Sequence, residues 1–220
     1  MIVAIDGPAG AGKSTIASRV ARQLGAQLID TGALYRTVAY QACRRQVDLE
    51  DGQAVAEVAG QLHFEFEFDG RDNVLICNGD SVGDEIRSAD ISKKASIVSA
   101  HPQVRQALLG VQRELGHRRD SVLEGRDIGT VVFPEADVKI YLTASPSERA
   151  RRRAAQMRRQ GIEADFDEIR AEIVARDERD KHRDVAPLVK AEDAVEIDSS
   201  DLSIDEVVDR ILAVVDARSD

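Results

Sequence analysis

Apolar and polar positions along the chain follow two alternating patterns. Short runs rich in Val, Ile and Leu are separated by longer stretches in which apolar residues recur every three or four positions. The short runs are typical of strands and the longer stretches of amphipathic helices, so their order predicts an α/β fold with a parallel sheet. Most runs are too apolar to leave one face in water, which predicts strands buried on both faces. Five core strands are expected, at residues 2–6, 27–30, 121–124, 138–143 and 194–198.

Three of the expected helices begin with capping signals. In each, a Ser or Asp precedes a Glu by three positions, the spacing at which the two side chains can cap the first turn. A proline at the first helical position strengthens the first of them. The pairs are Ser145 with Glu148, Asp165 with Glu168, and Ser203 with Glu206.

One segment departs from the α/β alternation. Residues 63–68 alternate apolar and polar side chains with period two, and Asp69 and Gly70 then lead through Asn73 to a second extended run at 74–77. Period-two alternation around a turn signal is typical of a hairpin. The sequence therefore predicts a small antiparallel β insert.

Composition excludes several classes of protein. The chain has 220 residues, 43% of them hydrophobic, enough to bury a full core as one domain. Its formal net charge of -10 disfavours a nucleic-acid polymer as partner, because binding the phosphate backbone requires a basic face. Cys43 and Cys77 have neither disulfide-framework nor zinc spacing. With no basic leader and no run of 18 apolar residues, we expect a cytoplasmic protein without a membrane span.

A phosphate-binding loop is the strongest chemical signal in the sequence. The pattern G-x-x-x-x-G-K-[ST] follows the first expected strand and precedes an amphipathic helix. Backbone N–H groups of such a loop face phosphate, Lys13 places a charge at the β- and γ-phosphates, and the Ser14 hydroxyl can ligate Mg²⁺. A glycine-rich turn with an incidental lysine is the weaker alternative. The loop residues are Gly7, Pro8, Ala9, Gly10, Ala11, Gly12, Lys13, Ser14 and Thr15.

Two further segments could hold a second anion. Residues 30–36 leave the second strand and present a hydroxyl, N–H groups and Arg36 together, although Arg36 could also be an exposed helix arginine. Residues 124–130 follow the third strand, where α/β sheets bind ligands. There Arg126 can contact a phosphate, Asp127 can accept from an exocyclic amine, and Glu124 can hold a Mg²⁺-bound water. The alternative is a local Arg126–Asp127 ion pair.

Two charged clusters near the C-terminal third are ambiguous by themselves. Arg176, Asp180 and Arg183 have the spacing of one helix face, with Arg179 beside them, and alternating charges of this kind often mean a solvated surface. The other cluster could be an arginine-rich flap that closes over ATP and excludes water. Its members are Arg149, Arg152, Arg153, Arg158 and Arg159.

Together these motifs resemble bacterial cytidylate kinase. The resemblance runs in order from about residue 2 to residue 215 and rests on the P-loop and on residues 30–36, 124–134 and 176–187. It implies one P-loop kinase domain of three layers, in which helices cover both faces of a five-stranded parallel sheet, with an antiparallel insert and an arginine-rich lid in addition. The implied core is 1–30, 118–145 and 184–220, the monophosphate-binding part about 31–117, and the lid about 146–183.

The resemblance also implies roles for individual residues. Arg36, Arg126 and Arg183 would grip the acceptor phosphate with Thr31 nearby, Asp180 would meet the ribose hydroxyls, and Ser96, Arg105 and Asp127 would read cytosine. Lys13, Arg126, Arg183 and the lid residue Arg153 would act on the transferred phosphoryl group of ATP. Mg²⁺ would be held by Ser14, with Glu124 acting through water. Some relatives carry Ser in place of Thr31 and Asp in place of Glu124, and both exchanges keep the functional group.

The implied reaction transfers the γ-phosphoryl group of ATP to CMP or dCMP, in a protein expected to be a monomer. Two alternatives stay open. One is a P-loop kinase for UMP, dTMP or shikimate. The other is a nucleotide-dependent switch, although the N-K-x-D element of switch GTPases is absent from the sequence.

Overall fold

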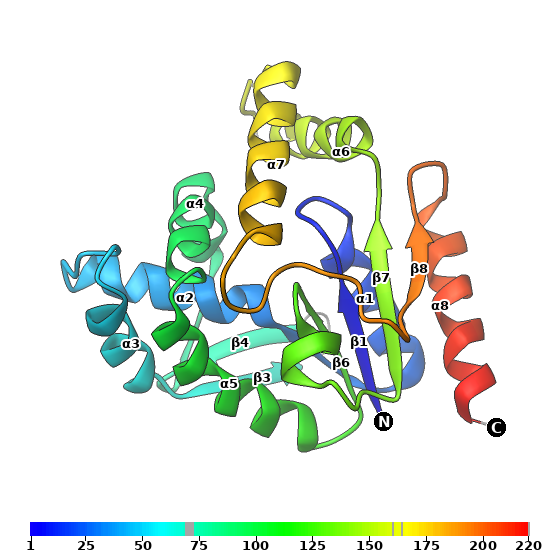
Figure 1. Ribbon diagram of the computed structural model, residues 1–220, viewed down its shortest axis with the longest axis horizontal. Coiled ribbons are helices and arrows are strands. Elements are labelled where there is room, and N and C mark those ends of the chain that lie inside the picture. The colour runs from blue at the N-terminus through cyan, green and yellow to red at the C-terminus, as the bar shows by residue number, and fades with distance from the viewer. Residues whose placement is uncertain (69–72, 160, 164, 220) are drawn as a thin grey trace.

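A computed structural model of the chain describes residues 1–68, 73–159, 161–163 and 165–219. A five-stranded parallel sheet in the order β2-β6-β1-β7-β8 forms its centre (Figure 1). Four of the five predicted strands agree with the structure at their first residue, and the fifth begins one residue later than predicted. The strands are β1 (Ile2–Asp6), β2 (Gln27–Asp30), β6 (Ser121–Gly125), β7 (Val138–Thr143) and β8 (Val195–Asp198).

Helices cover both faces of this sheet, which confirms the three-layer prediction. One face packs on α1 and α8 through a cluster that includes Ile5, Val20 and Ile211, and the other packs mainly on α2 and α5 through a cluster that includes Leu34 and Leu123. The helices are α1 (Lys13–Leu24), α2 (Thr31–Arg44), α3 (Gly52–Gly60), α4 (Ala89–Val98), α5 (Pro102–His117), α6 (Pro146–Arg159), α7 (Phe166–Lys181) and α8 (Ile204–Ser219). None of the described helices is long and apolar enough to cross a membrane.

The capping signals mark helix starts in the structure. The Ser145 hydroxyl accepts from the Glu148 N–H at 3.2 Å at the start of α6, and the Asp165 carboxylate accepts from the N–H of Glu168 at 3.0 Å at the start of α7. Before α8, the Ser203 hydroxyl and the Glu206 carboxylate cap each other's N–H groups, as a capping box does. All three predicted starts are therefore confirmed.

The predicted insert is a small antiparallel sheet of β3 (Phe64–Phe68), β4 (Asn73–Cys77) and β5 (Asp80–Ser81). The period-two pattern buries Phe64, Phe66 and Leu75 against the main core. The side-chain amide of Gln27 donates to the Phe66 carbonyl and joins the insert to the central sheet. The predicted turn residues Asp69 and Gly70 lie outside the described residues. The third strand, β5, was not predicted, because two exposed residues carry no pattern.

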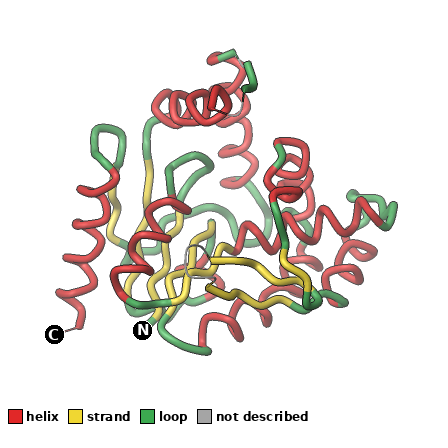
Figure 2. The backbone as a smooth tube through the Cα atoms, turned by 180° about the vertical axis from the view of Figure 1, so that it is seen from behind, coloured by secondary structure: helices red, strands yellow, loops and turns green. Residues whose placement is uncertain are grey.

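Two short helical turns complete the structure: η1 (Asp84–Arg87) and η2 (Ile128–Val132). In the second, the N–H of Phe133 donates to the Ile128 carbonyl at 2.7 Å, five residues back, so this turn is wider than an α-helix. Seen from behind in Figure 2, α6 runs across the top of the molecule, above the carboxyl ends of the parallel strands. The ligand-binding edge of the sheet therefore faces the α6–α7 pair.

Candidate active site

The P-loop connects the carboxyl end of β1 to the first turn of α1, as the sequence predicted. Gly7 has φ +150°, and a Cβ placed there would lie 1.9 Å from the Leu142 carbonyl oxygen, so only glycine fits. Lys13 Nζ donates to the carbonyls of Gly7 and Pro8, each at 2.9 Å, and closes the loop on itself. Burial lowers the pKa of Lys13 to about 7, and the positive charge of Arg126 acts in the same direction. An anionic phosphate in the loop would favour the charged form of Lys13.

Sequence reasoning missed Asp6, the last residue of β1. Its carboxylate is 5% exposed and accepts from the N–H groups of Ile128 and Gly129 at 2.8 and 2.7 Å, and so fixes the start of η2 next to the P-loop. Burial raises the pKa of Asp6 to about 6, against the opposing effect of the two N–H donors. A carboxylate at a strand end directly before a P-loop is the signal that could have identified it.

The segment after β2 leaves the strand and enters α2, as predicted, and Arg36 lies at this helix start. The Asp30 carboxylate caps α2 by accepting from the Ala33 N–H at 2.9 Å, and its second oxygen pairs with Arg36 at 2.8 Å. Arg36 Nε is buried without a partner among the described residues. The Thr31 hydroxyl donates to the Glu124 carbonyl at 2.7 Å and joins this helix start to β6. Arg36 is therefore held by Asp30 at the carboxyl end of β2 and is not a freely exposed helix arginine.

Arg126 and Asp127 each pair with a residue far away in sequence. Arg126 Nε donates to the Asp180 carboxylate at 3.0 Å, and Asp127 accepts from Arg105 in a buried ion pair. The alternative of a local Arg126–Asp127 pair is therefore wrong. The two pairs bring α5, α7 and the end of β6 to one place.

The residues proposed to read cytosine are only partly assembled. Arg105 and Asp127 are buried together, Arg105 also donates to the Ser99 carbonyl at 3.2 Å, and its guanidinium lies 5.5 Å from the centre of the Tyr35 ring. With other residues they line a cavity of about 70 Å³. Ser96 is half-buried on α4, one turn before Ser99, whose hydroxyl donates to its carbonyl. The structure thus joins Arg105 to Asp127, while the role expected for Ser96 stays a prediction.

The charged cluster of α7 is not a solvated stripe. Asp180 is 5% exposed, and although burial acts to raise its pKa, the positive charges of Arg126, Arg176 and Arg183 outweigh it and lower the pKa. Burial lowers the pKa of Arg176 to about 10. Arg183 lies two residues beyond the end of α7, so the prediction that it shares the helix face is wrong. Its guanidinium instead donates to the carbonyls of Ala186 and Ser99, on the side of Arg105.

The residues around Glu124 fit a magnesium-dependent site. Glu124 is buried, its Oε1 has no partner among the described residues, and burial raises its pKa while Lys13 and the Ser14 hydroxyl act to lower it. Ser14 is exposed at the first turn of α1. Mg²⁺ prefers oxygen ligands and usually takes only one or two from the protein, the rest from water and phosphate. The described residues contain no cluster of three or more His, Cys, Asp or Glu that could bind a metal alone.

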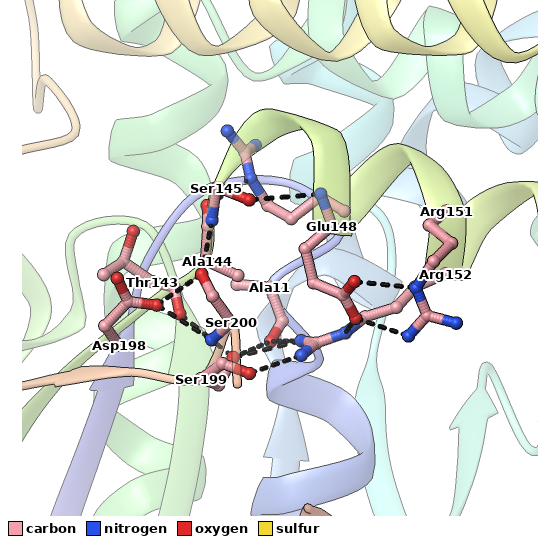
Figure 3. A network of polar contacts seen from close by, with 11 residues as sticks. Ala11, Thr143, Ala144, Ser145, Glu148, Arg151, Arg152, Asp198, Ser199 and Ser200 are labelled. Carbon is pink, nitrogen blue, oxygen red and sulfur yellow. Dashed lines mark hydrogen bonds and ion pairs between the residues drawn. The ribbon is translucent and has the colours of Figure 1, made fainter. Parts of the chain in front are cut away.

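The arginines of α6 divide into two groups. Arg152 donates to the Ala11 carbonyl of the P-loop and to Ser199 after β8, and Glu148 holds both Arg151 and Arg152 (Figure 3). Arg149 reaches the same loop at Ala9. Arg153 donates to Gln156 one turn on. The structure therefore brings Arg149 and Arg152 to the donor loop, while the role expected for Arg153 stays a prediction.

A P-loop at the end of β1, with arginines and carboxylates gathered along the same sheet edge under a two-helix cover, defines a small-molecule kinase of the P-loop class. The profile of the cytidylate kinase family matches residues 3–217, so the chain belongs to that family. The cytidylate kinase of Anoxybacillus flavithermus is 47% identical over 216 residues, which cover 98% of this chain and 96% of the relative. The cytidylate kinase of Syntrophotalea carbinolica is 47% identical over 219 residues, covering 99% and 93%.

Solved structures support the fold. Shikimate kinase from Bacteroides thetaiotaomicron aligns with a TM-score of 0.53 at 15% identity, covering 98% of both chains. An uncharacterized protein from Eubacterium ventriosum aligns with a TM-score of 0.52 at 14% identity, covering 99% of both. At these identities the likeness shows the P-loop kinase fold and does not indicate the acceptor. The family match therefore carries the choice of acceptor.

Proposed function

We propose that this protein transfers the γ-phosphoryl group of ATP to CMP or dCMP and releases ADP with CDP or dCDP. The family match is supported in the site itself by the buried Arg105–Asp127 pair, which lies at the sheet edge beside Arg126, Asp180 and Arg183. Cytosine offers an N4 amine to a carboxylate and two acceptors to a guanidinium. A base that must satisfy both side chains would be cytosine, and the neighbouring arginines would hold its phosphate.

The chain's own residues align two mutually repelling anions. Lys13 and the loop N–H groups hold the donor phosphates, while Arg36, Arg126 and Arg183 hold the acceptor phosphate and Asp180 its ribose, with Thr31 fixing the helix start beside them. The acceptor oxygen attacks in line, so no covalent enzyme intermediate is needed. Mg²⁺, bound through Ser14 with Glu124 acting through water, would neutralise charge on the donor phosphates.

Rejection of UMP follows from the same pair. Uracil presents O4 where Asp127 requires a donor, so a buried carboxylate would lose its partner. We therefore expect UMP to be a poor acceptor. The division into a core, a monophosphate-binding part and a lid (1–30, 118–145 and 184–220; about 31–117; about 146–183) is part of this proposal, as are a monomeric state, a cytoplasmic location and the absence of a nucleic-acid partner.

The test is a coupled assay of ADP formation with ATP and Mg²⁺ against CMP, dCMP, UMP, AMP, dTMP and shikimate. Fast turnover with the two cytidylates and slow turnover with UMP supports the proposal. A different preferred acceptor would keep the kinase and remove the assignment of Asp127 and Arg105 to cytosine. Slow ATP hydrolysis that no acceptor stimulates would favour the nucleotide-dependent switch.

A further inference from the structure

Helices α6 and α7 form a unit with an apolar cluster of its own. Ala150, Ala154, Ile169 and Ile173 are buried between them, with Met157 against the edge, and this cluster is separate from the two that flank the sheet. The unit stands above the carboxyl ends of the strands (Figure 1). Its position over the site therefore depends on the side chains that link it to the rest of the chain.

Arg149 is the most deeply buried of these linking side chains, at 3% exposed. Its Nε donates to the Ala144 carbonyl and its Nη1 to the Ala9 carbonyl of the P-loop, each at 2.9 Å, and the same Nη1 lies 2.6 Å from the Asp177 carboxylate of α7. A Cβ on Gly10 would lie 3.3 Å from the Arg149 Cβ, so the side chain packs directly against the loop. Arg149 thus joins the donor loop to α7.

Asp177 lies one turn before Asp180 on α7, and the two carboxylates point to different sites. Asp177 pairs with Arg149 at the donor loop, whereas Asp180 pairs with Arg126 on the acceptor side. Asp177 also lines a cavity of about 430 Å³ between α7 and the β7–β8 edge, with Pro8 and other residues. The cavity separates this side of α7 from β7 and β8. The Arg149–Asp177 pair instead connects α7 directly to the P-loop.

We propose that Arg149 and Asp177 are a positioning pair that couples binding of the acceptor to binding of the donor, an inference that rests on the proposed function. Acceptor ribose and phosphate compete for Asp180 and Arg126, which are paired in this structure. When that pair opens, α7 changes its position. Asp177 then moves Arg149, and Arg149 moves the Ala9 carbonyl of the P-loop. The first nucleotide to bind then supplies the free energy needed to close the α6–α7 unit. The second nucleotide meets a unit that is already closed, so each nucleotide tightens binding of the other. Linkage requires the two effects to be equal.

The test measures binding of CMP by calorimetry, with and without a saturating β,γ-imido analogue of ATP and Mg²⁺. In the wild-type protein we expect CMP to bind at least about 5-fold tighter when the analogue is present, the lower end of typical couplings. Asp177→Asn keeps the side-chain volume and removes the charge, and its ratio should fall below about 2. Arg151→Ala is the matched control, because Arg151 lies on the same helix and, among the described residues, pairs only with Glu148 in an exposed contact.

The ratio separates positioning from stability. An Asp177→Asn protein that is folded by circular dichroism and keeps the wild-type ratio contradicts the inference, and so does one in which both CMP affinities fall by the same factor. If that variant does not fold, Arg149→Lys replaces it. Arg149 reaches Ala144 through Nε and reaches Ala9 and Asp177 through Nη1, and the one nitrogen of a lysine cannot occupy both positions. A wild-type ratio in Arg149→Lys contradicts the coupling equally. A wild-type protein that binds no CMP refutes the proposed function, whereas one that binds CMP with a ratio of one refutes only the coupling.

Discussion

Asp127→Asn exchanges a buried carboxylate for an amide of nearly equal size and tests which side chain reads the base. Asp127 is 4% exposed and pairs with Arg105, so the change removes charge with little loss of packing. The amide oxygen can still accept from Arg105. Its NH₂ group would then face the N4 amine of cytosine, donor against donor, whereas it could donate to O4 of uracil.

The size of the effect follows from the hydrogen bond that is lost. A hydrogen bond to a charged group contributes about 1.5–3 kcal/mol, and about 1.4 kcal/mol is a factor of ten in rate. We therefore expect kcat/KM for CMP to fall about 10- to 150-fold, with kcat/KM for UMP unchanged or higher. Breaking a buried ion pair from one side can also destabilise the fold by about 3–5 kcal/mol, since Arg105 is left with a neutral partner.

Steady-state kinetics with CMP and UMP at several temperatures check this, each below the melting temperature of the variant. Asp205→Asn is the control, because Asp205 is exposed on α8 and pairs with Arg19 at the surface. The reasoning is refuted if the ratio of kcat/KM for CMP to that for UMP stays at its wild-type value in a folded Asp127→Asn protein. An equal fall in kcat/KM for CMP and UMP would mean that Asp127 supports the structure of the site and does not read the base.

Three other predictions address charge. Arg183→Ala should lower kcat with CMP by about 10³-fold or more in a rapid-quench assay, by analogy with other phosphoryl-transfer arginines. Arg179→Ala, on the exposed surface of α7, should change kcat little in that assay. A near-normal kcat for Arg183→Ala would mean that Arg183 is a surface residue with no part in catalysis. Because the pKa of Asp6 is raised from 3.8 to about 6, the folded protein binds a proton at Asp6 more tightly than the unfolded chain does. The contribution of Asp6 to the free energy of unfolding is therefore full below about pH 4 and is lost as pH rises to about 6. Melting temperatures across that window should fall less steeply for Asp6→Asn than for wild type, and parallel curves would contradict this. Chelation of Mg²⁺ should abolish turnover, and Glu124→Gln should raise the Mg²⁺ concentration needed for half-maximal rate; an unchanged Mg²⁺ requirement would remove Glu124 from the metal site.

Features with a local cause were predictable from the sequence. Strand positions followed from apolar runs, helix starts from caps such as Ser203 with Glu206, and the donor site from the spacing of Gly7, Gly12 and Lys13. In each of these the residues that determine the structure lie within about nine positions of one another. Hydrophobic periodicity and capping act over this range, so one sequence is enough to read them.

The partners of the buried charges were decided by the tertiary structure. Arg105 and Asp127 are 22 positions apart and Arg126 and Asp180 are 54 apart, and nothing in their neighbourhoods specifies the pairing. The sequence placed Arg126 beside Asp127, yet burial at the end of β6 turns their side chains to different helices. The end of α7 before Arg183 likewise depends on contacts made by the following segment.

The sequence by itself therefore determined the sheet, the P-loop and the family resemblance, while only the tertiary structure showed how Arg149 and Asp177 join α6, α7 and the donor loop. The physical reason is that a buried charge requires an opposite charge within a few ångströms, and which one it meets is set by how helices pack over the sheet. Packing brings together residues from distant parts of the chain. Local spacing along one sequence carries no record of that arrangement.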